Sequence, residues 1–193
     1  MIGQITPLVK VASTRIWVTA VVGHVAGSVV SAMAVGWILG SIGMLIGSQR
    51  WTLSLELAGL AFLACAVQDT TTRCRLLPTL QRQTPKRLRE ELGPVWGPLV
   101  WGIDLGQGWT TRIVFSGYYA LVVSAFLVGS PLSGCLLVGV YGLSRTLPIV
   151  VAILQAAHGE QGQLGFGYIR REMAFRQASI VLLSLTAGYL IVS

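Results

Sequence analysis

The longest uncharged stretch of the chain is IWVTAVVGHVAGSVVSAMAVGWILGSIGMLIGSQ, which runs from Ile16 to Gln49. No residue in this stretch carries a formal charge, and most of its side chains are apolar. A helix of about 32 residues would be roughly 48 Å long, whereas the hydrocarbon core of a bilayer is about 30 Å thick. We therefore expect one long membrane helix that is tilted or bent. Two short passes are the alternative.

The rest of the chain shares this apolar character. Of its 193 residues, 53% are hydrophobic and 11% are charged, and the mean hydropathy is +0.71. A soluble domain usually carries about 25% charged residues, because its surface has to be wetted. The 23 glycines are typical of membrane helices that approach one another closely. The composition predicts an all-α, polytopic integral membrane protein with a single membrane domain over residues 1–193.

Polar breaks divide the apolar sequence into five expected spans. We place these spans at residues 16–47, 51–67, 99–128, 132–155 and 178–192, with long polar loops at 68–97 and 158–177. The two loops carry six and three basic residues, so the positive-inside rule predicts that both are cytoplasmic. The N-terminus is then cytoplasmic and the C-terminus is outside the cell (inner) membrane. If residues 16–49 make two passes, the number of spans becomes six and the N-terminus moves outside.

Charge and motifs narrow the expected function. The net charge of +7 lies mostly between apolar runs, which favours membrane lipid over nucleic acid as a partner. The chain has no Walker loop, HExxH or GxSxG motif, so we expect no enzyme activity. Cys65, Cys74 and Cys135 fit no metal-binding spacing, and we expect neither a metal nor a cofactor. Partner membrane subunits are a further possibility.

The candidate site consists of polar residues at membrane depth. A charged side chain there costs about 2.5–3.5 kcal/mol on insertion scales, so each one needs a physical reason. We expect His24, Asp104, Arg112 and Arg145 to line a polar path through the membrane. The alternatives are that Arg145 extends its side chain to the membrane surface and that His24 is a packed core residue.

Glycine and proline predict where the helices break. Asp104 and Arg112 flank a glycine-rich segment that contains Gly102, Gly106 and Gly108, and Pro148 interrupts the fourth span. Irregular backbone at membrane depth is tolerated where protein or water satisfies its polar groups. We therefore expect these four residues to act as helix breaks or as a gate. A simple interfacial loop before the third span is the alternative.

Two short motifs resemble the transmembrane CcdA/DsbD family of thiol–disulfide carriers. The segment LGQGWTTR at Leu105–Arg112 is similar to the LG-x-G-W-T-P-C stretch of that family. The segment YGLSRTLP at Tyr141–Pro148 is similar to its Y-x-L-G-x-G-x-P stretch. The likeness covers roughly residues 101–155 and implies a CcdA-like helical scaffold.

The redox cysteines that the resemblance would imply are absent. Arg112 stands where the family has a cysteine, and Thr111 replaces the proline before it. Thiol–disulfide exchange requires a thiolate that attacks a disulfide, so we do not expect electron transfer. Three hypotheses follow: small-solute or ion transport, with arginines suited to an anion; a non-catalytic helical subunit of a larger membrane complex; and a divergent thiol–disulfide relay.

Overall fold

The computed structural model describes residues 14–47, 51–71, 88–108, 110, 116–157, 177, 180–182, 184–186, 188 and 190. These residues contain helices α2 (Thr14–Ile46), α3 (Trp51–Thr71), α4 (Leu88–Gly106), α5 (Gly117–Val128) and α6 (Pro131–Ala157). Helical turns recur among residues 177–190, and no described residue is in a strand. The all-α prediction is therefore confirmed. The expected 178–192 span is described only in part, and the expected loop 158–177 lies outside the described residues apart from residue 177. Of the expected loop 68–97, the described residues 68–71 and 88–97 are helical.

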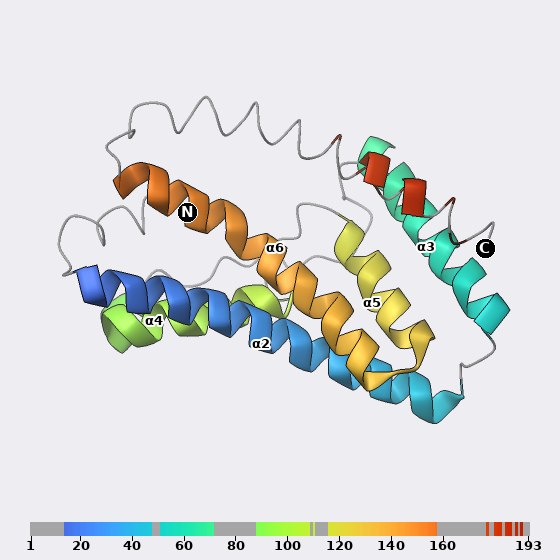
Figure 1. Cartoon of the computed structure of the whole chain (residues 1–193), viewed down its shortest axis with the longest axis horizontal. Helices are drawn as coiled ribbons and strands as arrows, with labels where there is room; N and C mark the ends of the chain where they lie inside the picture. Colours follow the sequence, from blue (N-terminus) through green and yellow to red (C-terminus); the bar gives the residue numbers. More distant parts are fainter. Residues whose placement is uncertain are drawn as a thin grey trace.

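Helix α2 is the centre of the fold. It packs against α4, α5 and α6, while α3 packs against α5 (Figure 1). Gly36 of α2 faces Gly134 of α6, and Ser28 faces Gly142, so these two helices run antiparallel. Helix α4 runs parallel to α2, because Gly23 faces Leu99 and Ser28 faces Gly106. One 33-residue helix therefore supplies the main packing surface for three others.

Glycines allow the helix backbones to touch. A Cβ atom built on Gly27 would lie 2.5 Å from the carbonyl oxygen of Leu99 in α4. A Cβ on Gly36 would collide with the carbonyl group of Gly134 in α6, and a Cβ on Gly43 would collide with that of Phe126 in α5. These are contacts with backbone atoms, which cannot rotate away as a flexible side chain could. Each contact therefore requires glycine on α2.

The range 99–128, expected as one span, contains the end of one helix and the whole of another. Helix α4 ends at Gly106, and α5 begins at Gly117. Gly108 lies in the connection with φ at +78°, a conformation that favours glycine. A second irregular residue, Gly93 (φ 76°, ψ −179°), kinks α4 near its start.

The outer helices pack through small residues. Phe62, Cys65 and Ala66 of α3 form a buried cluster with Ala120 of α5. A second cluster joins Ala32 of α2, Tyr118 and Ala125 of α5, and Val138 of α6. Short side chains predominate in both clusters, which keeps the helices close together.

The multi-pass topology is not supported. Among the described residues, only Arg15–Ile46 is long and apolar enough to cross a membrane. The shorter apolar helix Gly117–Val128 has 12 residues, or about 18 Å, which is less than the hydrocarbon core of about 30 Å. The expectation of five or six spans counted apolar runs without knowing where the helices end. The supported statement is that one apolar helix could be a membrane span or a signal sequence.

We expect Gly36→Leu to destabilise the fold because the new side chain would meet the backbone of α6 at Gly134. Overpacking of this kind costs about 1–3 kcal/mol, and more where backbone must move. Thermal unfolding of the purified protein, followed by tryptophan fluorescence, measures the loss. Ala34→Leu is the matched control, since Ala34 is exposed on the same helix. Equal stability of the two variants would contradict the packing argument.

Candidate functional site

His24 lies at the contact between α2 and α4. Its side chain is 4% exposed, and its Nδ1 atom lies 3.1 Å from the carbonyl oxygen of Pro98. The imidazole ring also packs on Trp101, with the ring centroids 4.6 Å apart. The backbone carbonyl of His24 faces Gly102, where a Cβ would collide with it. Both the side chain and the backbone carbonyl of His24 thus contact the same part of α4.

Two serines continue this polar contact along α2. Ser31 Oγ donates to the carbonyl oxygen of Ile103 in α4 at 3.0 Å. Ser28 Oγ donates to the carbonyl oxygen of Gly142 in α6 at 3.1 Å. Hydrogen bonds from serine to a neighbouring helix stabilise helix pairs in an apolar surrounding. We call the set His24, Ser28 and Ser31 the α2 polar seam.

A tyrosine–arginine cluster joins the end of α4 to α5 and α6. Tyr118 OH donates to the carbonyl oxygen of Gln107 at 2.6 Å, and a Cβ on Gly108 would strike the Tyr118 ring. The Tyr118 and Tyr141 rings lie 4.7 Å apart. Arg145 Nη1 donates to Tyr141 OH at 2.5 Å, and its guanidinium lies 5.7 Å from the centre of that ring. The phenol and the aromatic face both stabilise the arginine charge.

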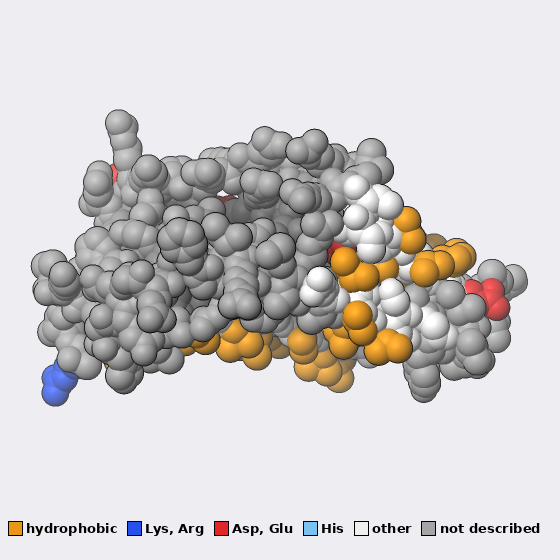
Figure 2. Space-filling model, turned by 90° about the horizontal axis from the view of Figure 1, so that it is seen from above, with side chains coloured by type: hydrophobic (Ala, Val, Ile, Leu, Met, Phe, Trp, Pro, Cys, Tyr) orange, Lys and Arg blue, Asp and Glu red, His pale blue; other side chains and the backbone are white. Residues whose placement is uncertain are grey.

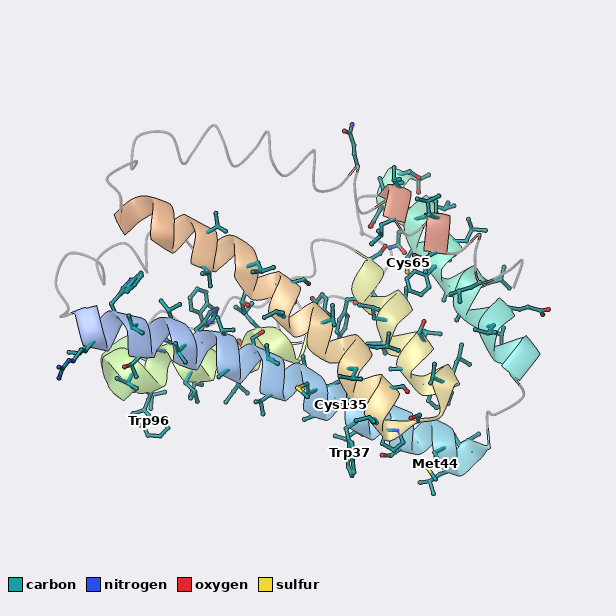
Figure 3. The ribbon with its side chains drawn as sticks, in the orientation of Figure 1. Trp37, Met44, Cys65, Trp96 and Cys135 are labelled. Carbon is teal, nitrogen blue, oxygen red and sulfur yellow. The ribbon has the colours of Figure 1, made fainter. Side chains whose placement is uncertain are left out.

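A buried carboxylate joins α3 to α5. Asp69 is 1% exposed, and its two oxygens lie 3.1 and 3.3 Å from the backbone nitrogen of Ser116, the N-cap of α5. Ser116 Oγ donates to the carbonyl oxygen of Cys65 at 2.8 Å. Figure 3 shows Cys65 between α3 and α5. A carboxylate is favourable here because the N-terminus of a helix carries partial positive charge.

The structure describes three of the four residues expected to line a polar path, and that path stays a prediction. His24 lies on α2 and contacts α4, and Arg145 lies on α6, where it contacts Tyr141. Asp104 lies on α4, and its backbone carbonyl accepts a hydrogen bond from Thr110 Oγ1 at 2.5 Å. Arg112 lies outside the described residues.

The four residues expected to break helices lie at different places: two within helices, one at a helix end and one in a connection. Gly102 lies inside α4 against His24, and Gly106 ends α4 against Ser28. Gly108 lies in the connection that follows, against the Tyr118 ring. Pro148 lies within the continuous helix α6. Among the residues that the structure describes, no group of three or more His, Cys, Asp or Glu could hold a metal ion.

Several residues of these contacts were not singled out from the sequence. Tyr141 stands four residues before Arg145, and this helical spacing could have indicated the pair. The expected loop 68–97 includes Asp69, but α3 continues to Thr71 and the carboxylate is buried. Tyr118 and Ser116 gave no comparable signal, because their partners lie on other helices.

We expect Asp69→Ala to destabilise the protein because it removes the acceptor of a buried backbone N–H at Ser116. The expected loss is about 1–3 kcal/mol, the cost of an unsatisfied buried group. Asp69→Asn keeps one acceptor oxygen and should lose less. Thermal unfolding in detergent compares both with Glu56→Gln, an exposed position on α3. If Asp69→Ala unfolds together with that control, the carboxylate does not stabilise the contact.

Comparison with known proteins finds two curated relatives, both named methylamine utilization protein MauF. The chain is 28% identical over 142 residues to the methylamine utilization protein MauF of Paracoccus versutus. It is 27% identical over 141 residues to MauF of Paracoccus denitrificans. Each match covers 72% of this chain and 51% or 50% of the relative, so the chain spans about half the length of these curated relatives. No family model matches, and no solved structure gives a significant match.

These matches correct the functional reading of the sequence. The resemblance to the CcdA/DsbD family was wrong, since the relatives are MauF proteins and no family model supports it. The prediction of small-solute or ion transport is overturned by the same finding. The alternatives of a helical subunit and a thiol–disulfide relay gain no support. The first motif holds two glycines and the second holds one, and Gly106, Gly108 and Gly142 each have a packing role of their own.

Proposed function

We propose that this protein takes part in methylamine utilization as a membrane-embedded helical protein with no catalytic activity of its own. The observation that carries this proposal is the match of 72% of the chain to MauF from two Paracoccus species. The biological process is taken from the names of those relatives. The helices themselves support the membrane setting and the absence of catalysis.

Helix α2 supports the membrane setting. Only 28% of its most apolar window is buried inside the protein, so most of this surface needs another apolar environment. Trp37 and Met44 project from α2, and Trp96 projects from α4, on the side away from α6 (Figure 3). Lipid chains would cover such a surface. Lys10 precedes α2 in the sequence and Arg15 lies in its first turn, and these charges favour a cytoplasmic N-terminus in the inner membrane.

Helix α6 carries a continuous apolar stripe on its outer face. The stripe consists of leucine and valine side chains that are 44–70% exposed: Leu132, Leu136, Val140, Leu143, Leu147 and Val151. From Leu132 to Val151 the helix rises about 29 Å, which is close to the thickness of the hydrocarbon core. Figure 2 shows how hydrophobic side chains gather along the lower edge of the molecule and at its right-hand end.

The two faces of α6 differ in the way expected of a helix at a lipid boundary. Gly134, Val138 and Gly142 are buried against α2, while the large side chains point outward. In a bilayer, helix pairs associate through small residues, because lipid already satisfies large apolar side chains. This arrangement favours lipid over a second helix as the partner of the stripe. The hydrogen bond and the ring contact of Arg145 with Tyr141 reduce the cost of its charge.

The contacts of two ionisable side chains, Asp69 and Arg145, support a role without catalysis. Asp69 accepts a backbone N–H at the start of α5, and Arg145 donates to a phenol on its own helix. These interactions hold helices and charges in place, as a structural role requires. His24 differs from Asp69 and Arg145, because its buried Nε2 atom has no hydrogen-bond partner among the described residues.

We expect deletion of the gene from its host to abolish growth on methylamine as the only nitrogen source. Growth on ammonium should remain normal, and a plasmid copy of the gene should restore growth on methylamine. Growth curves in the two media make the comparison. Equal growth of the deleted and parental strains on methylamine would contradict the proposed process.

If lipid covers the apolar stripe of α6, a cysteine placed on that stripe should react slowly with a water-soluble maleimide. In a background with the three native cysteines replaced by alanine, Val140→Cys should resist a membrane-impermeant maleimide in intact membranes, because lipid covers the stripe. Glu56→Cys is the control at an exposed, charged position on α3. Both should react after detergent and denaturant are added. Rapid labelling of Val140→Cys in intact membranes would show that water, not lipid, covers α6.

A further inference from the structure

His24 carries a buried nitrogen atom that the helix contacts do not use. The Pro98 carbonyl oxygen can only accept, so the Nδ1 atom facing it carries a proton. In the neutral imidazole the other nitrogen, Nε2, is then an acceptor. Nε2 is fully buried and has no hydrogen-bond partner among the described residues. Such an atom is unfavourable unless a small donor reaches it.

The surroundings of His24 restrict which donor could reach Nε2. The side chain is 4% exposed, and the ring of Trp101 lies 4.6 Å from the imidazole. Helices α2 and α4 are in backbone contact at this level, where His24 faces Gly102. A bulky ligand would have to separate the two helices. The geometry therefore favours a donor of one or two heavy atoms.

The chemistry next to Nε2 favours a cation among small donors. An indole face attracts a positive charge, and a neutral imidazole nitrogen accepts a strong hydrogen bond from an ammonium N–H. A neutral hydroxyl would gain only the hydrogen bond. A quaternary ammonium would gain only the attraction of the ring, since it has no N–H group.

We propose that His24 and Trp101 form a binding site for a small primary ammonium ion, with methylammonium as the ligand. In this site Nε2 of His24 would accept one N–H bond, and the charge would be next to the Trp101 ring, whose centroid lies 4.6 Å from that of the imidazole. The Nδ1 hydrogen bond to Pro98 holds the imidazole in the required tautomer. This inference rests on the proposed role in methylamine utilization for the choice of ligand, and on the His24 geometry for the site.

The test is equilibrium dialysis of radiolabelled methylamine against the full chain, purified in detergent at neutral pH. We expect saturable binding that ammonium displaces and tetramethylammonium does not. His24→Phe keeps an aromatic ring but removes the acceptor, and it should weaken binding at least tenfold. Trp17→Phe is the matched control, because it removes another buried polar nitrogen on α2, seven residues from His24. It should leave binding unchanged.

A second measurement keeps the test decisive if His24→Phe does not fold. In wild-type protein with ¹⁵N-labelled histidine, methylammonium should shift the Nε2 resonance of His24 and leave the other histidine unmoved. Absence of binding, displacement by tetramethylammonium as effective as by ammonium, or an unmoved Nε2 resonance would each overturn the site. In those cases a bound water remains the donor at Nε2. The growth phenotype on methylamine judges the proposed function separately from this site.

Discussion

The close approach of the α2 backbone to three neighbouring helices is the constraint on which the other contacts depend. Gly27, Gly36 and Gly43 each stand where a Cβ atom would strike a carbonyl group of α4, α6 or α5. Backbone atoms cannot rotate aside, so the positions of these helices are set by glycine rather than by interlocking large side chains. The larger apolar side chains of α2 are consequently free to face outward, which accounts for the apolar surface of the molecule.

The same approach makes the α2 polar seam possible. Serine and histidine side chains are short, and they reach carbonyl oxygens of α4 and α6 only because the backbones are already in contact. In an apolar surrounding these hydrogen bonds have no competition from water. Asp69 likewise satisfies a buried backbone group between α3 and α5, where it accepts the N–H of Ser116, the N-cap of α5. His24 belongs to the seam through Nδ1, whereas Nε2 is available to a ligand.

The failed resemblance has a physical explanation in the same glycines. A motif such as LGQGWTTR was compared with a family pattern in which glycines precede a reactive cysteine. In this protein Gly106 packs against Ser28 and Gly108 packs against Tyr118, so packing alone can produce that spacing. The match to MauF depends instead on identity spread over 142 residues. A long alignment therefore carries more weight here than two short motifs.

From the sequence alone, the all-α class and the long uninterrupted helix after residue 14 could be predicted, because hydropathy and helical periodicity are local properties. Helix ends were less predictable: the run 99–128 looks continuous in hydropathy, yet it contains the break between α4 and α5. The site contacts were decided by the tertiary structure. His24 meets Pro98 across 74 residues, and Ser28 meets Gly142 across 114. No local pattern encodes such pairs, since they exist only when glycine lets distant backbones come together.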